Sequence, residues 1–207
     1  MKKCLIYIYL LLLTSLCCLQ AGAVSSEIRS LSVSDGLPDL VINTIYKDSK
    51  GYVWMGTNTS VERFDGIRLE HYMVEGSNEN LKRVFALVEM PGNELWVGTG
   101  MGLFRLADDA EKLERLAPEM ITSGVHAFCK LGDVLYVGTE KGLYVYKGGV
   151  FEHVLVDKNI FSRANFVTGM VEGENGILWL STMGGLKSLR LSDQSITSFS
   201  DKLAKNG

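Results

Sequence analysis

The chain of 207 residues has few of the groups that carry catalytic or metal chemistry. It contains three histidines, His71, His126 and His153, which are far apart in the sequence, and no two of them have the spacing of a metal site. It also lacks a Gly-x-Ser-x-Gly nucleophile motif. We therefore expect ordinary strand histidines, no catalytic residue, no metal, no cofactor and no enzymatic activity.

Cysteine is scarce as well, and its placement argues against a disulfide-stabilised fold. Three of the four cysteines, Cys4, Cys17 and Cys18, lie near the N-terminus, and none follows the small residue typical of a lipoprotein signal. Cys129 alone falls in the rest of the chain, within an apolar run. We expect it to be a buried small hydrophobic residue.

The first 23 residues have the pattern of an export signal. Lys2 and Lys3 precede an apolar stretch over residues 4–19, and the small residues 21–23 resemble a leader-peptidase site. We predict a signal peptide over residues 1–23, cleavage before Val24 and a periplasmic location. The alternative is a retained membrane anchor through residues 4–24, since this stretch is almost long enough to span a bilayer.

Charge of one sign is not concentrated anywhere. The chain holds 21 Lys and Arg against 24 Asp and Glu, and loss of the leader would remove Lys2 and Lys3 and no acid. A mildly acidic chain with dispersed charge gives no electrostatic reason to bind nucleic acid. With 46% hydrophobic residues and 22 glycines, the composition indicates a folded β-protein rather than a disordered segment.

One short phrase with a central aromatic residue and a closing threonine occurs four times, about 40 residues apart. The copies occupy residues 51–57, 92–99, 132–139 and 176–182. Their central aromatics are Trp54, Trp96, Tyr136 and Trp179. A steady period of this length indicates a propeller or a solenoid.

Each copy belongs to a unit of four short strands joined by Gly and Asp turns. The expected units lie near residues 41–72, 84–116, 125–154 and 166–199. The second strand of each unit is apolar at consecutive positions, whereas the last strand is more polar, as expected for a propeller blade with a wet outer edge. We predict an all-β fold over residues 24–207: about sixteen strands in four antiparallel sheets of a β-propeller, with the four aromatics buried and no long helix.

The small and acidic residues of the repeat have structural interpretations. Gly56, Gly98 and Gly138 follow the aromatic, where a strand near the centre of a ring has little room for a side chain. Thr57, Thr99, Thr139 and Thr182 close the strand before the loop. Asp48, Asp65 and Asp133 fall at turns, where a carboxylate can bond local backbone amides.

The first unit carries a family resemblance. It combines Gly36-Leu37-Pro38 with an Asp-x-x-Gly turn at residues 48–51, Trp-Met-Gly-Thr at 54–57 and Phe-Asp-Gly at 64–66. In this order these motifs resemble the two-component regulator propeller repeat, and the resemblance extends over about residues 28–200. The departures are residues 58–61 in place of a Gly-Leu pair, Tyr136 in place of Trp and Ser181 in place of Gly.

The resemblance implies a function. Such repeats build the periplasmic sensor region of hybrid two-component systems, which in gut bacteria detect glycan fragments. It implies a non-catalytic sensor propeller whose partner is an oligosaccharide, without the kinase and DNA-binding parts in this sequence. It also implies four blades of a ring that has seven in the family. We therefore expect a truncated chain and an incomplete ring, whose ends meet further blades or another copy of the chain. The only expected membrane contact is an uncleaved signal or a missing downstream span.

The loops between the second and third strands vary while the strands around them repeat. Because binding residues lie preferentially on loops held by a rigid scaffold, we expect Asn58, Glu140 and Lys141 to lie on the face that meets a ligand or a partner domain. The alternative is a protein-interaction scaffold without a small ligand, since propellers host many unrelated roles.

Overall fold

The structure is a computed structural model that describes residues 30–74 and 81–199. The chain divides into two parts, Met1–Leu31 and Ser32–Gly207, and every described strand belongs to the second part. The signal peptide expected over residues 1–23 lies outside the described residues. Within the described ranges no helix has the length and apolar character needed to cross a membrane.

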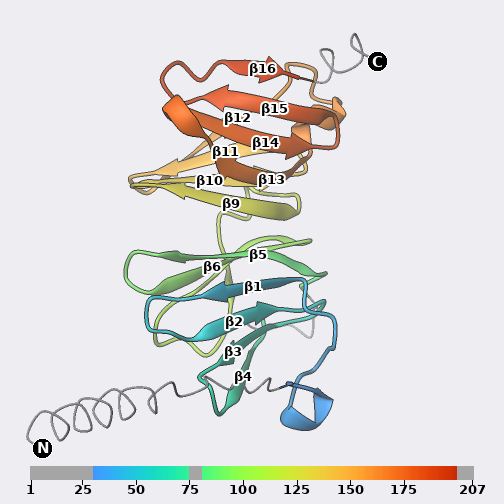
Figure 1. Cartoon of the computed structure of the whole chain (residues 1–207), viewed down its shortest axis with the longest axis vertical. Coiled ribbons are helices and arrows are strands. Elements are labelled where there is room, and N and C mark those ends of the chain that lie inside the picture. The colour runs from blue at the N-terminus through green and yellow to red at the C-terminus, as the bar shows by residue number, and fades with distance from the viewer. Residues whose placement is uncertain (1–29, 75–80, 200–207) are drawn as a thin grey trace, which may run out of the picture. The chain divides into compact units, whose positions relative to one another are not determined.

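The described strands form four antiparallel sheets of four strands each, in which chain neighbours pair (Figure 1). The first sheet contains β1 (Thr44–Lys47), β2 (Val53–Gly56), β3 (Val61–Phe64) and β4 (Leu69–Tyr72). The second contains β5 (Val84–Met90), β6 (Glu94–Thr99), β7 (Gly102–Leu106) and β8 (Glu114–Arg115). The third contains β9 (Val125–Leu131), β10 (Val134–Thr139), β11 (Gly142–Lys147) and β12 (Val150–Val154). The fourth contains β13 (Val167–Glu172), β14 (Ile177–Thr182), β15 (Gly185–Arg190) and β16 (Ile196–Ser198).

The helical segments of the described residues are three short 3-10 turns, Val33–Asp35, Arg163–Asn165 and Glu174–Gly176. The prediction of an all-β fold with about sixteen strands in four antiparallel sheets is therefore confirmed.

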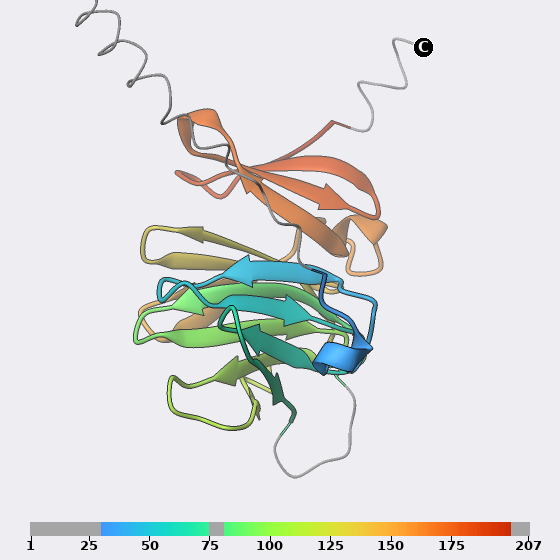
Figure 2. The same cartoon turned by 60° about the horizontal axis from the view of Figure 1, so that its bottom comes forward.

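The sheets are arranged in chain order through their first strands. Strand β1 contacts β5, β5 contacts β9, and β9 contacts β13, so the first strand of each sheet is the inner one. The four sheets do not close a ring (Figures 1 and 2). This is the arrangement of propeller blades in an incomplete ring, as predicted.

The hydrophobic core consists of three clusters, each between two successive sheets. Trp54 of the first sheet packs with Leu95 and Val97 of the second. Trp96 of the second sheet packs in the same way with Val125 and Leu135 of the third. A third cluster joins the third and fourth sheets. The central aromatics Trp54, Trp96 and Tyr136 of the first three sheets thus pack toward the next sheet along the chain.

The four repeat aromatics occupy equivalent registers but differ in burial. Trp54 and Trp96 are buried, with exposed fractions of 5% and 3%. Tyr136 and Trp179 are only half-buried, so the prediction that all four are buried is wrong for these two. For Trp179 the cause is its position, because no described sheet follows the fourth one, and its ring instead packs on Phe199 at 5.1 Å between centroids.

The repeat glycines allow successive inner strands to approach each other. A Cβ atom on Gly56, Gly98 or Gly138 would lie 2.5 to 2.8 Å from a side-chain carbon of the first residue of the next inner strand. These residues are Val84, Val125 and Val167. The interpretation of these glycines as packing residues agrees with this geometry.

The repeat threonines close the loop between the second and third strands. Thr99 Oγ1 donates to the carbonyl oxygen of Gly102 at 3.0 Å, and Thr139 Oγ1 donates to that of Gly142 at 2.8 Å. Each threonine oxygen also accepts a bond from the backbone N–H two residues later, in these sheets from Met101 and Lys141. The hydroxyl therefore fixes the loop from both sides, as in other side-chain turns.

The turn carboxylates differ from one another. Asp48 accepts from the backbone N–H of Tyr52 at 2.8 Å, and Asp65 accepts from those of Ile67 and Arg68, as expected for turn residues. Asp133 does lie in the β9–β10 turn, but its carboxylate makes no hydrogen bond or ion pair with any residue that the structure describes, so the expected bond to a local amide is wrong for this residue. The thiol of Cys129 is half-buried rather than buried, and burial raises its pKa.

Candidate functional site

Three inner strands contain an irregularity at the end where the β2–β3, β6–β7, β10–β11 and β14–β15 loops lie. The register of pairing shifts between Val84 and Ala86, around His126, and between Val167 and Gly169. One residue of each inner strand, namely Phe85, His126 or Thr168, is thereby left out of the ladder. A β-bulge of this kind redirects the side chain of the extra residue.

Two of these side chains, Phe85 and His126, meet across neighbouring sheets, and Phe166, the residue directly before β13, continues the contact. Thr168 instead bonds Ser181 of its own sheet. The ring centroids of Phe85 and His126 lie 4.1 Å apart, and those of His126 and Phe166 lie 4.8 Å apart. At the other side, the guanidinium of Arg83 lies 5.9 Å above the Phe85 ring, within the range of a cation–π contact. We call Phe85, His126 and Phe166 the inner aromatic row.

Asn58, one of the residues expected on the ligand face, lies beside this row and is engaged in a local network. Its Nδ2 donates to Asp39 at 2.8 Å, and its Oδ1 accepts from Asn43 at 3.2 Å and from Nε of Arg83 at 3.4 Å. The hydrogen bond from the backbone amide of Val41 lowers the pKa of Asp39 most, and the side-chain and backbone hydrogen bonds from Asn58 lower it further. The visible role of Asn58 is to position Arg83.

Glu140 and Lys141 are adjacent in the β10–β11 loop but turn to different partners. Glu140 Oε1 lies 3.2 Å from Nε2 of His126, so this carboxylate stands next to the inner aromatic row. The ammonium of Lys141 instead donates to the hydroxyl of Thr122 at 3.2 Å. The structure thus places Asn58 and Glu140 beside the row, at Arg83 and His126 respectively, and Lys141 away from it.

The row itself was not predicted from the sequence, which suggested an ordinary strand role for His126. The repeat does contain a signal from which the positions of Phe85 and His126 could have been predicted. Phe85 and His126 each directly precede the residue that pairs with the repeat glycine of the same sheet. Aligning the second and third units on that glycine, and the fourth unit on Ser181, therefore aligns the three redirected positions.

The row and its neighbours offer flat apolar ring faces next to a guanidinium, a carboxylate and an amide. Such a set can bind a ligand that has both an apolar face and hydroxyl groups. It contains no nucleophile activated by a base. Among residues 30–74 and 81–199, no three His, Cys, Asp or Glu side chains are grouped so as to hold a metal ion.

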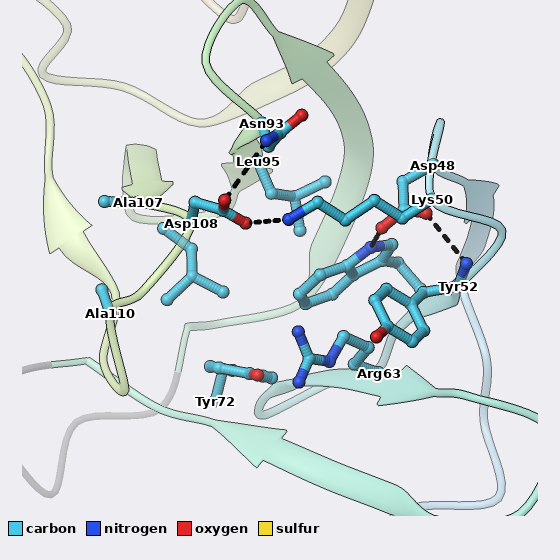
Figure 3. Close-up of a pocket in the computed structure, with 12 residues that line it drawn as sticks. Asp48, Lys50, Tyr52, Arg63, Tyr72, Asn93, Leu95, Ala107, Asp108 and Ala110 are labelled. Carbon is cyan, nitrogen blue, oxygen red and sulfur yellow. Dashed lines mark hydrogen bonds and ion pairs between the residues drawn. The ribbon is translucent and has the colours of Figure 1, made fainter.

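The opposite end of the sheets, where the β1–β2 and β3–β4 turns lie, also has a hollow between the first and second sheets. We call it the first groove; Figure 3 shows it in close-up. Lys50 of the first sheet forms an ion pair with Asp108 of the second sheet across it, and Asn93 also donates to Asp108. Hydrogen bonds from Lys50 and Asn93 lower the pKa of Asp108.

Arg63 fills the remaining space of the first groove. Its guanidinium lies 4.7 Å from the ring centroid of Tyr52 and 5.6 Å from that of Trp54. The cavity that is left has a volume of about 20 Å³, which holds little more than one water molecule. The first groove is therefore occupied by the chain's own side chains and is not the candidate site.

Comparison with known proteins supports the fold and the repeat. Residues 36–59 match the family of the two component regulator propeller. No curated protein matches the chain.

Solved structures resemble the chain over most of its length. The extracellular domain of a protein named as a hybrid two component system from B. thetaiotaomicron shares 22% identity at a TM-score of 0.70, covering 83% of this chain and 26% of that one. A second such domain from B. thetaiotaomicron shares 22% identity at a TM-score of 0.66, covering 78% and 22%. Virginiamycin B lyase from Staphylococcus aureus shares 17% identity at a TM-score of 0.57, covering 78% and 56%.

The chain spans only about a quarter of the two extracellular domains that it resembles. At these identities the structural likeness concerns the fold. Together with the family match and the four repeated sheets, it confirms the resemblance inferred from the sequence. The chain carries a two component regulator propeller repeat at residues 36–59, within an incomplete β-propeller.

Proposed function

We propose that the chain is a non-catalytic, exported ligand-recognition module of a two-component signalling protein, and that its ligand is an oligosaccharide. The observation that carries the proposal is the inner aromatic row, which crosses from the second to the fourth sheet next to Arg83 and Glu140. The likeness to extracellular domains of hybrid two component systems supports an exported location and a signalling role.

The chemistry of the row favours a sugar over a purely apolar or purely ionic ligand. A pyranose ring has C–H faces that pack on aromatic rings, and hydroxyls that both donate and accept hydrogen bonds. Glu140 can accept such bonds and Arg83 can donate them, while Phe85 and Phe166 supply ring faces. We propose Asn58 and Lys141 as residues of the same face, Asn58 through its hold on Arg83.

Because Phe85 lies on β5, His126 on β9 and Phe166 directly before β13, a ligand that bridges them would change the contact between these three strands. Such a change in the relative placement of blades is the rearrangement that a linked kinase would receive. No bond of the ligand is made or broken in this scheme. The ligand can shift the equilibrium between the two blade arrangements by no more than the difference between its binding free energies for them.

Isothermal titration calorimetry against a panel of neutral and acidic oligosaccharides tests the proposal. We expect one member of the panel to bind. Glu140→Gln, which keeps the shape but removes the charge, and Phe85→Leu, which removes the ring, should each weaken binding by about five- to tenfold, equivalent to roughly 1–1.4 kcal/mol. Asn58→Ala should weaken it as well, because Arg83 loses a partner.

Glu152→Gln is the matched control, since Glu152 is exposed on β12 and outside the row. Unchanged affinity in both the Glu140 and Phe85 variants would exclude the row as the site. Hydrolysis or elimination of any sugar in the panel would contradict the non-catalytic proposal.

A protein-interaction scaffold is the second candidate, and one observation favours it. The face of the fourth sheet that points away from the third carries Val171 and Leu186 with exposed fractions of 62% and 43%, beside half-buried Trp179. An apolar sheet face of this kind is typical of an interface. Absence of binding to every sugar, with this face protected from labelling in a complex, would favour the scaffold.

A further inference from the structure

A second groove lies between the second and third sheets, at the same turn end as the first groove. The two are built on the same framework. Trp54 lines the first and Trp96 lines the second, each from the middle of the second strand of its sheet. On the opposite walls, Leu95 and Leu135 are likewise equivalent.

The two grooves differ greatly in size, and the sequence explains why. The second groove has a volume of about 530 Å³, against about 20 Å³ for the first. Lys50, four residues before Trp54, corresponds to Gly92, four residues before Trp96. Asp108 corresponds to Gly148, which lines the second groove.

Both partners of the ion pair that closes the first groove are therefore glycines in the second. The resulting volume is within the range of ligand sites in proteins.

The charges of the two grooves differ as well. In the first groove two carboxylates face two cations, which leaves the lining neutral. In the second groove Glu94 and Asp133 face one cation, Lys130, so one carboxylate is in excess. The ammonium of Lys130 already donates to the backbone oxygen of Glu89 at 3.0 Å.

Asp133 is the uncompensated carboxylate. It occupies the position of Asn93 in the preceding unit, three residues before the central aromatic. Glu94 accepts from Nε1 of Trp96 at 3.2 Å and lies 3.8 Å from Arg105, whereas Asp133 has no such partner within the described part of the chain. A carboxylate at the edge of an open groove, without an ion pair to any described residue, is a site for a positive group from outside.

Aromatic rings complete the second groove. The rings of Trp96 and Tyr146 meet edge to face, with centroids 4.8 Å apart, and Tyr146 replaces the Leu106 of the first groove. In the first groove, aromatic rings and a carboxylate hold the cations Arg63 and Lys50. The second groove has the rings and the carboxylates but has Gly92 at the position of Lys50.

We propose that the second groove binds a protonated primary amine, such as the side chain of a lysine residue, with its ammonium between Glu94 and Asp133 and its methylene chain along Tyr146. Lys50 in the first groove is the intramolecular model for this ligand. The site is at the opposite end of the sheets from the inner aromatic row and does not depend on its ligand. The same ammonium chemistry is available from a lysine of a partner protein or from a free diamine.

Titration of the ¹⁵N-labelled chain with Nα-acetyl-lysine N-methylamide tests the proposal, with the indole N–H of Trp96 as the reporter. We expect this signal to shift, and those of Trp54 and Trp179 to stay unchanged. The norleucine analogue, which has the same methylene chain without the ammonium, should cause no shift. Raising the salt concentration should weaken the interaction, because exposed charges are screened.

Variants assign the contacts. Asp133→Asn and Glu94→Gln should each raise the dissociation constant about threefold, as for an exposed ion pair. Tyr146→Leu, which restores the residue of the first groove, should raise it about two- to threefold. Asp109→Asn is the control, since it removes an exposed carboxylate outside the second groove.

Equal shifts with the lysine and norleucine compounds would overturn the proposal in favour of a purely apolar groove. Absence of any shift at tens of millimolar ligand would overturn it outright. Binding of 1,5-diaminopentane without binding of the lysine compound would assign a free amine as the source. Stronger binding of a lysine-containing peptide than of either would assign a protein partner.

Discussion

Trp96 and Trp179 allow one substitution to be compared at two equivalent positions. Both stand in the middle of the second strand of their sheet, opposite Val88 and Val171 respectively. Trp96 is enclosed by the third sheet and touches Tyr146 and Phe151, whereas no sheet among the described residues follows the one that holds Trp179. Replacing each by Ala separates the effect of packing between sheets from that of the residue itself.

The expected magnitudes follow from burial. A fully buried indole removes about 200 Å² of surface from water, and at roughly 25 cal/mol/Å² this is worth about 5 kcal/mol. Trp96→Ala should therefore lower the free energy of unfolding by about 3–5 kcal/mol, including the cavity that it leaves. Trp179→Ala should lower it by about half as much, because its site is open to solvent on one side and no closed cavity forms.

Equilibrium urea unfolding followed by far-UV circular dichroism measures both values without relying on tryptophan fluorescence. The double variant of Trp96 and Tyr146 adds a coupling measurement, expected at about 0.5–1.5 kcal/mol for an edge-to-face pair. Equal destabilisation by the two Trp variants would refute the reasoning, since it would mean that contact with the next sheet adds nothing.

Two further predictions concern buried positions. Burial raises the pKa of Glu62, whose carboxyl group bonds His71. The folded state therefore favours the protonated form of Glu62, and ionisation of this group lowers the stability of the fold. Stability should therefore fall as the pH rises from below 4.5 through the raised pKa, and Glu62→Gln should flatten this dependence in thermal melts. Gly98→Ala should destabilise by about 1–3 kcal/mol, because its Cβ would lie 2.9 Å from the backbone oxygen of Val125. Gly56→Ala should destabilise at least as much in urea unfolding, since its Cβ would lie 2.5 Å from Cγ1 and 2.8 Å from Cβ of Val84; a clearly smaller loss would contradict this reasoning.

The fold could be predicted because the repeat records the packing of each sheet on the next. The spacing of Trp54, Trp96, Tyr136 and Trp179 indicated the blades, and Gly98 indicated the close approach of the next inner strand. Unequal burial of the four aromatics was missed. The sequence does not show whether a neighbouring sheet covers a given tryptophan, because the residue type is the same in both cases.

The candidate site was only partly accessible from the sequence. Asn58 and Glu140, which the sequence proposed for the ligand face, contact Arg83 and His126 in the structure. The rings beside them were not predicted, because the bulges at Phe85 and His126 depend on the register of strand pairing. The unused carboxylate of Asp133 could not be distinguished from the turn carboxylates of Asp48. That distinction requires the positions of the backbone amides around each turn.

In each bulged strand, the residue whose side chain is redirected is a different residue from those that pair in the sheet. Phe85, His126 and Thr168 occupy the same place in three sheets, yet they are a phenyl ring, an imidazole and a hydroxyl, and none takes part in the ladder. A change at one of these positions alters one contact point and leaves the strand pairing intact. The residue at this position can therefore vary in one blade without affecting the others. The number of possible surfaces is the product of the alternatives at each blade.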